Sequence, residues 1–102
     1  MTELDKLEAY LKDKGIPYKR KDHRPAFLSA GVTALDFHQI IVYDKDGNRL
    51  WDAISHYGSY GFRQGLIEIM GDTVVDPKKD RDTVVGWLSA VDVIRRIEGK
   101  DD

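Results

Sequence analysis

The stretch FHQIIVYDKDGNRLWDAISHYGSYGFRQGLIEIMG, residues 37–71, decides the fold. Its first half holds two segments rich in β-branched and aromatic residues, 37–43 and 49–56, which suit a pleated and half-buried surface. Between them lies Asp46-Gly47, the dipeptide that most easily adopts the positive φ angles of a tight two-residue turn. The sequence therefore predicts a β-hairpin that turns at these two residues.

The predicted turn also fixes which side chains face each other across the hairpin. It places Asp44 opposite Arg49, Val42 opposite Trp51 and Ile40 opposite Ala53. Side chains alternate along a strand, so one face of the hairpin would be apolar, with Ile40, Val42, Trp51 and Ala53. The other face would be mixed, with Tyr43, Leu50, Ile41 and Ile54 beside Gln39, Asp52 and His56. A slip of one residue would exchange the faces of one strand.

A helix is predicted near each end of the chain. The first spans residues 3–14 and begins after Thr2, a good N-cap residue, with leucines spaced along one helical face. The last spans residues 90–98 and begins after Ser89, with an acidic residue three positions later that completes a capping box. Both helices should bury one apolar stripe.

Three more regions of the chain are expected to add strands. Residues 18–23 form a charged strand that belongs at a sheet edge, and residues 66–70 form a strand between two glycines. The tetrad Asp-Thr-Val-Val occurs at 72–75 and again at 82–85, which favours two strands joined by a solvated loop. The region 24–36 is left open between a bent strand and a covering loop.

The resulting fold class is α+β. We expect a single domain over residues 1–102, with a mainly antiparallel sheet of four to six strands and with N- and C-terminal helices packed on it. The two helices would cover one face. The other face, or its edge, would be left to an aromatic, glycine-rich loop at residues 56–65.

The composition excludes several classes of protein. The chain has no cysteine, which removes disulfides, thiolate catalysis and cysteine-based metal sites. No apolar stretch approaches the length needed to span a bilayer, and the acidic, amphipathic start MTELDKLEAY does not resemble a signal peptide. The net charge of −2 argues against general affinity for phosphate backbones. We therefore expect a cytoplasmic protein without membrane association.

No pattern in the sequence indicates a metal site or a cofactor. Residues 44–48, DKDGN, resemble the start of a calcium loop, but Arg49 and Ser55 occupy the positions where such a loop needs glycine and glutamate. The histidines His23, His38 and His56 have no metal-ligand spacing, and phosphate-binding or dinucleotide-binding glycine motifs are missing. We expect no metal, no cofactor and no catalytic constellation.

One cluster of side chains is a candidate binding surface. It consists of Trp51, Asp52, His56, Tyr57, Tyr60 and Arg63. Tyr, Trp and Arg are the residue types that dominate binding hot spots in protein interfaces. The alternative is structural, because aromatic residues are most often used in packing: Trp51 would then be part of the core and the tyrosines would hold the loop in place.

Parts of the second half of the chain resemble a group of small uncharacterised proteins of bacteria and their prophages or mobile elements. The likeness lies in WDAISHYGSYGFRQGLIEIMG, residues 51–71, and in VVGWLSAVDVIRRI, residues 84–97. The resemblance implies a biological context and assigns no functional residues.

The sequence leaves three hypotheses about function. The first is a non-enzymatic module that presents the candidate surface to a protein partner, or to a second copy of itself. The second is nucleic-acid binding, in which Lys19, Arg20, Lys21 and Arg24 contact phosphates while Tyr57 or Tyr60 stacks on bases. The third is an enzyme that acts on a small ligand through Asp52, His56 and Arg63, which requires these groups to converge in a pocket.

Overall fold

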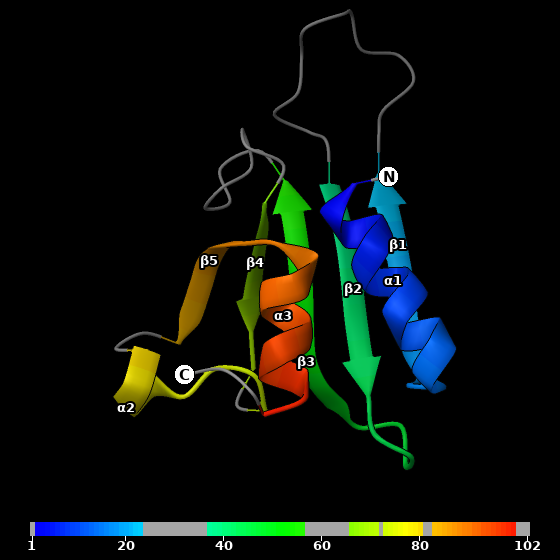
Figure 1. Ribbon diagram of the computed structural model, residues 1–102. Coiled ribbons are helices and arrows are strands. Elements are labelled where there is room, and N and C mark those ends of the chain that lie inside the picture. Colours follow the sequence, from blue (N-terminus) through cyan, green and yellow to red (C-terminus); the bar gives the residue numbers. More distant parts are fainter. Residues whose placement is uncertain (1, 24–36, 57–65, 72, 81–82, 100–102) are drawn as a thin grey trace, which may run out of the picture.

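The protein folds as one α+β unit, a five-stranded antiparallel sheet with helices on one side (Figure 1). The computed structural model describes residues 2–23, 37–56, 66–71, 73–80 and 83–99. The elements are α1 (Glu3–Lys14), β1 (Tyr18–His23), β2 (Phe37–Tyr43), β3 (Arg49–His56), β4 (Ile67–Met70), α2 (Pro77–Asp80), β5 (Val84–Leu88) and α3 (Ala90–Ile97). The strands lie side by side in sequence order, β1-β2-β3-β4-β5, so every connection joins neighbours.

The two terminal helices form as predicted. In α1 the Thr2 hydroxyl accepts from the Asp5 backbone, and the Asp5 carboxylate accepts from the Thr2 backbone. Ser89 and Asp92 make the same reciprocal pair at the start of α3. These capping boxes use backbone N–H groups that no helical carbonyl can reach, which is why both helices begin where the sequence indicated. Helix α1 ends at Gly15, whose φ is +68°.

The hairpin of β2 and β3 has the predicted register in its body but a different turn. The residue opposite Arg49 is Tyr43, and not Asp44 as predicted. The loop is one residue longer than predicted: the Asp44 N–H donates to the Asn48 carbonyl at 2.9 Å, which leaves residues 45–47 as a three-residue loop. The Asp44 side chain stabilises this form, since its Oδ1 accepts from the backbone N–H groups of Asp46 and Asn48.

A bulge in β3 restores the predicted pairing. The register shifts between Val42 and Tyr43, so that Leu50 has no direct partner on β2. Beyond this point Val42 faces Trp51 and Ile40 faces Ala53, as predicted. The extra residue in the turn and the extra residue in the bulge of β3 have opposite effects on the register. The apolar side chains of both strands therefore remain on one face, as predicted.

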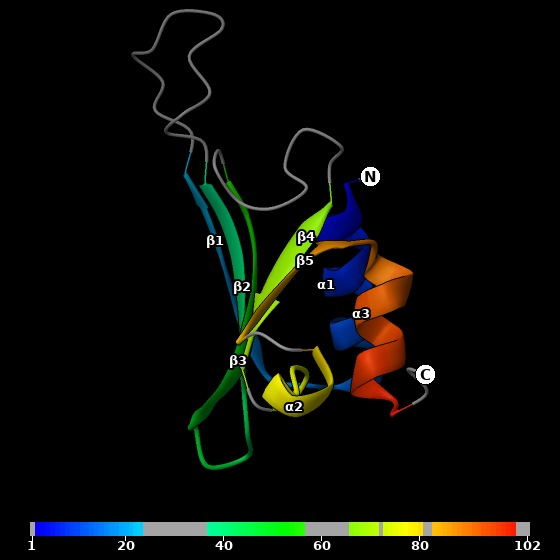
Figure 2. The ribbon, with the colours of Figure 1, turned by 90° about the vertical axis from the view of Figure 1, so that its left-hand side faces the viewer.

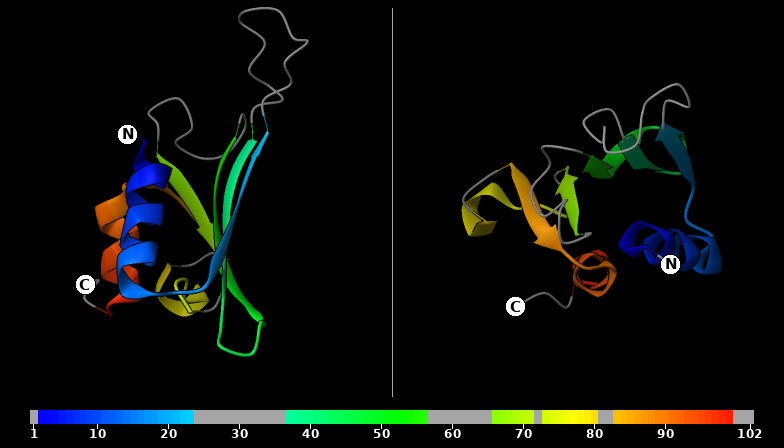
Figure 3. Two further views of the ribbon diagram at one scale, coloured as in Figure 1. Left: turned by 90° about the vertical axis from the view of Figure 1, so that its right-hand side faces the viewer. Right: turned by 90° about the horizontal axis from the view of Figure 1, so that it is seen from above.

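Helices α1 and α3 both lie on the face of the sheet that bears those apolar side chains (Figures 2 and 3). The core between the layers is completely or almost completely buried, and it includes Leu4, Leu7, Leu11, Ile40, Val42, Trp51, Ala53, Ile67, Ile69, Ala90 and Val93. The opposite face of the sheet has no described helix on it. We call it the helix-free face.

Residues 73–75, which belong to the first Asp-Thr-Val-Val tetrad, do not form a strand, so the strand predicted over 72–75 was wrong. Strand β4 ends at Met70, and Gly71 follows with a φ of +136°. The backbone N–H groups of Val74 and Val75 both donate to the Gly71 carbonyl, so the chain turns instead of pairing. Both valines are buried against the core. The second tetrad does lead into a strand, β5, and the short helix α2 lies between them.

Gly71 offers the sharpest test of this packing. A Cβ at Gly71 would lie 2.5 Å from the Trp51 Cβ and 2.7 Å from the Leu50 carbonyl oxygen, and neither neighbour can easily move. We expect Gly71→Ala to lower the free energy of unfolding by more than about 2 kcal/mol in urea denaturation.

Gly47→Ala is the matched control for the Gly71 variant. Gly47 also has a positive φ, +87°, but no atom lies within 4 Å of the added Cβ. This change should cost only the left-handed backbone strain, roughly 1–2 kcal/mol. Equal losses for the two variants would contradict the close approach of Gly71 to Trp51.

Candidate functional site

The helix-free face is the part of the described molecule where predicted binding residues and open surface coincide. The strand register sets two cross-strand rows on it: Lys19, Ile41, Asp52, Met70 and Val84 in one, and Lys21, Gln39, Ile54 and Glu68 in the other. Neighbouring side chains in such rows lie within contact distance. In Figure 2 the sheet is seen nearly edge-on, with the helices on one side only.

Asp52 is the polar centre of this face. Its Oδ2 accepts a hydrogen bond from Gln39 Nε2 at 2.8 Å and lies 3.0 Å from Arg49 Nη2 in an ion pair. The Asp52 side chain is only 7% exposed, whereas that of Arg49 is 51% exposed. The carboxylate is therefore held in place by two partners and has little contact with solvent.

Apolar side chains surround this centre. Met70 is 47% exposed, Ile54 and Val84 are half-buried, and Ile41 is buried. Met70 was not among the predicted site residues, although the alternation within residues 66–70 already placed it on the opposite face from the core residues Ile67 and Ile69. Its exposure could not be predicted because it depends on which face the helices cover.

Trp51 does not belong to this surface. It is 4% exposed and lies in the core beneath the helices, on the face opposite to Asp52. This is the structural alternative considered for Trp51, and its ring is not available to a partner. His56 ends β3, while Tyr57, Tyr60 and Arg63 lie outside the described residues. The predicted surface is therefore represented here by Asp52 alone.

The basic segment of β1 is divided between the two faces. Lys19 and Lys21 are exposed and belong to the helix-free face. Arg20 points the other way, toward α1, where its Nη1 lies 2.8 Å from Asp5 Oδ1 and 3.1 Å from Glu8 Oε1. Arg24 lies outside the described residues. Lys19, Arg20 and Lys21 thus do not form one cationic surface.

Arg20 also belongs to a chain of charged groups that ends at His38. Its Nε donates to Asp22 Oδ1 at 3.1 Å, and His38 Nδ1 lies 2.8 Å from the same oxygen. Burial opposes the charged form of Asp22, but the hydrogen bonds from His38 and Arg20 outweigh it and lower the pKa of the Asp22 carboxyl. This network ties the edge strand β1 to β2 and α1.

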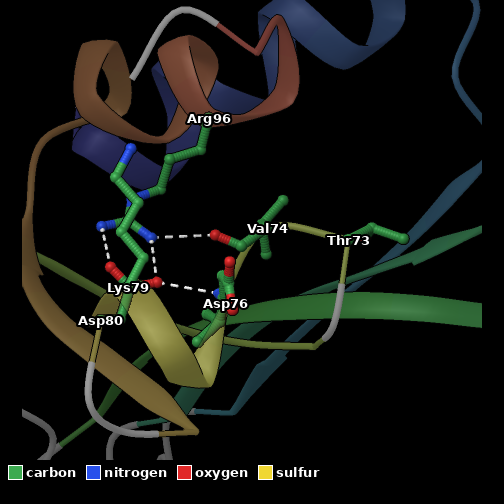
Figure 4. A pocket seen from close by; sticks show the side chains of 7 residues that line it. Thr73, Val74, Asp76, Lys79, Asp80 and Arg96 are labelled. Atoms are coloured by element: carbon green, nitrogen blue, oxygen red, sulfur yellow. Dashed lines mark hydrogen bonds and ion pairs between the residues drawn. The ribbon is translucent and has the colours of Figure 1, made fainter. Parts of the chain in front are cut away.

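A second polar cluster joins α2 to α3 (Figure 4). Arg96 donates through Nη2 and Nη1 to the two carboxylate oxygens of Asp80, each at 3.0 Å, and Nη1 also donates to the Val74 carbonyl at 2.9 Å. The Asp76 N–H donates to Asp80 Oδ2 at 2.9 Å. Hydrogen bonding from Arg96 is the main cause that lowers the pKa of Asp80 below its ordinary value of 3.8. The cluster holds α2 against α3, and we call it the Arg96–Asp80 clamp.

A mainly apolar cleft of about 270 Å³ lies at the end of the sheet next to the hairpin loop. It is lined by Ile16, Val42, Leu50, Trp51, Thr73, Val74 and Ile97. The polar side-chain groups of this lining are the Thr73 hydroxyl and the Trp51 indole N–H, so the cleft lacks a larger set of converging polar groups that could orient a substrate.

The described part of the chain has neither a cluster of metal ligands nor a helix that could cross a membrane. No group of three or more His, Cys, Asp or Glu side chains there could hold a metal ion. Among the described helices, none has the length and apolar character required to cross a membrane.

The chain was also compared with known proteins. No family model, no curated protein and no solved structure matches it. The resemblance of residues 51–71 and 84–97 to small bacterial and prophage proteins therefore stays a prediction.

Asp52, Gln39 and Arg49 form one polar cluster, and we expect the loss of its two charged side chains, Asp52 and Arg49, to lower the stability of the fold by different amounts. Replacing Asp52 by Ala leaves the half-buried Gln39 amide without its acceptor and removes the ion pair with Arg49. Because an unsatisfied buried polar group costs about 1–3 kcal/mol, we expect a loss of that size in urea denaturation of Asp52→Ala. Arg49→Ala should cost less than Asp52→Ala, because Arg49 is half exposed and the Asp52 carboxylate keeps its hydrogen bond from Gln39. The reverse order would contradict the described role of Asp52.

The Arg96–Asp80 clamp predicts a dependence of stability on pH. The folded-state pKa of Asp80 lies below the unfolded value of 3.8, so its contribution is present above this pH and is lost as the pH falls below it. Asp80→Asn should lower the free energy of unfolding by about 1.5–3 kcal/mol at neutral pH, a typical range for hydrogen bonds to charged groups. The difference from wild type should shrink below pH 3.8.

Chemical denaturation over a pH series measures this difference. Arg95→Lys is the control, because Arg95 is an exposed neighbour of Arg96 on the same helix. A constant difference between wild type and Asp80→Asn at every pH would contradict the clamp.

Proposed function

We propose that this domain is a non-enzymatic interaction module that binds a protein partner through the helix-free face of its sheet. The observation that supports this most directly is Met70, which is 47% exposed in the row between Asp52 and the half-buried Val84, with the half-buried Ile54 in the neighbouring row. Exposed apolar side chains that gather on one face, with charged groups around them, match the apolar centre and polar rim of protein interfaces. The cytoplasm stays the expected compartment of this proposal.

The arrangement around Asp52 favours recognition over catalysis. Its carboxylate already has two partners within 3.0 Å and is almost shielded from water. A general acid or base must instead reach the substrate directly or through one water molecule. The third hypothesis, an enzyme that uses Asp52 with His56 and Arg63, is therefore supported less well than the first.

The nucleic-acid hypothesis loses one of its four predicted cations. Arg20 is engaged with Asp5, Glu8 and Asp22 on the other side of β1. Of the three predicted cations that the structure describes, Lys19 and Lys21 are exposed on the helix-free face, and Arg24 lies outside the described residues. Two lysines provide a weak phosphate contact, since the affinity for nucleic acid grows with the number of phosphates neutralised.

Met70→Lys tests the proposed face. The ammonium group would be placed in the apolar centre, and we expect the bound partner to be lost or reduced at least about 10-fold, as desolvating a charge costs more than 1.4 kcal/mol. Affinity purification from the source cells, quantified by mass spectrometry against wild type, measures this loss.

Val91→Lys is the matched control, because Val91 is a similarly exposed apolar residue, at 57%, on α3. Its partner set should equal that of wild type. The proposal is wrong if Met70→Lys combined with Lys19→Glu and Lys21→Glu also leaves the partner set unchanged. A salt-sensitive loss of bound oligonucleotide with the two lysine changes alone would favour the nucleic-acid hypothesis instead.

A further inference from the structure

Strand β5 leaves an open, uncharged edge on the sheet. It is the last strand in the order β1-β2-β3-β4-β5, and within the described ranges no other strand pairs with its outer side (Figure 1). Residues 83–91, TVVGWLSAV, contain no charged side chain, although 33% of the whole chain is charged. An open edge presents backbone N–H and C=O groups that only another strand can pair with in a regular ladder.

The opposite edge of the sheet is protected in the usual way. Strand β1, YKRKDH, carries Lys, Arg, Lys, Asp and His at five of its six positions, and its two lysines, Lys19 and Lys21, are exposed. Charged side chains on an edge strand discourage pairing with other chains. The β5 edge lacks this protection by charge.

Trp87 distinguishes the β5 edge further. Gly86 and Trp87 together face Glu68, because the register between β4 and β5 shifts by one residue at this point. Trp87 has a φ of +62°, the only positive φ of a non-glycine residue in the described part of the chain, and it is 58% exposed. A large ring held outward by a conformation that L residues disfavour is costly in an isolated domain, and such outliers concentrate at functional positions.

We propose that the β5 edge pairs with the β5 edge of a second copy of this chain. A two-fold symmetric antiparallel pair brings identical strands together, so like charges would meet if the strand were charged. The β1 sequence would suffer this repulsion and the β5 sequence does not. A charged foreign strand would be selected by charges of opposite sign on β5. Because β5 has no charged side chain, pairing with a second copy is favoured over pairing with such a strand.

The symmetry determines the shape of the dimer. A two-fold axis perpendicular to the sheet joins the two sheets into one continuous antiparallel sheet, with the helices of both copies on the same side. The helix-free faces of the two copies would then also lie side by side. Trp87 would leave water at the new seam, which offsets the cost of its exposure. This inference goes beyond the proposed function, since the partner-binding face and the dimer edge are separate surfaces.

Sedimentation of the full chain over roughly 10 μM to 1 mM tests the pairing, because short edge-strand interfaces fall in the weak range of dissociation constants. We expect a monomer–dimer equilibrium for wild type. Trp87→Gly removes the ring and suits the positive φ, so it should fold at least as well as wild type but shift the dissociation constant at least about 10-fold upward. Trp87→Lys should do the same by charging the edge.

Met70→Lys is the control, because it places the same charge on β4, one strand inside the β5 edge, where residue 70 lies beside Val84 on the helix-free face. It should leave the dimer intact. The proposal is overturned if wild type is monomeric over the whole range, if Met70→Lys dissociates the dimer while the Trp87 variants do not, or if all variants dimerise equally. Loss of partner binding by Met70→Lys in a chain that still dimerises would leave both proposals standing.

A measurement on wild type alone covers the case in which the Trp87 variants fail to fold. Hydrogen exchange of the backbone amides of Val84–Leu88 should slow as the concentration rises through the dimerisation range, since the outer amides gain partners. Exchange that does not depend on concentration in β5 would overturn the pairing. Slowing confined to another element would assign the interface to that element instead.

Discussion

The structure depends above all on the pairing of Val42 with Trp51 across the central hairpin. This register sends both side chains, with Ile40 and Ala53, into the core beneath α1 and α3. It is set at two places at once. The Asp44 side chain fixes a loop one residue longer than the tightest turn, and a bulge at the start of β3 compensates for it. Loss of the longer loop or of the bulge alone would shift the strand register by one residue and bring apolar side chains to the wrong face.

The same alternation that builds the core also divides the charges. On β1, Arg20 and Asp22 point toward the helix side, where they join Asp5, Glu8 and His38, whereas Lys19 and Lys21 remain in solvent on the other side. On β3, Trp51 is buried on one side while its neighbour Asp52 belongs to the other. Residues that are adjacent in sequence thus serve different layers, and a cluster in the sequence is not a cluster in space.

This is why the sequence predicted the fold better than the site. Local signals determined the elements: capping boxes at Thr2 and Ser89, β-branched runs, and glycines at the ends of strands. The exceptions depend on longer contacts. The tetrad at 72–75 has strand-forming residues, yet Gly71 turns the chain so that Val74 and Val75 fill the core. The candidate surface combined Trp51 and Asp52 by proximity in sequence, whereas Met70 joins Asp52 only through the pairing of β3 with β4.

The two open surfaces of the sheet differ in what they can recognise. In the proposed function the helix-free face would meet a partner through side chains, and Lys19, Asp52 and Met70 would set the shape and charge that it selects. The β5 edge meets a partner through its backbone, which is the same in every strand and discriminates poorly. A chain that leaves such an edge uncharged must occupy it reliably, or it risks indiscriminate aggregation. A second copy of the chain is present wherever the first is made, so it is always available to pair with the β5 edge. Such a dimer would also present two helix-free faces to a partner instead of one.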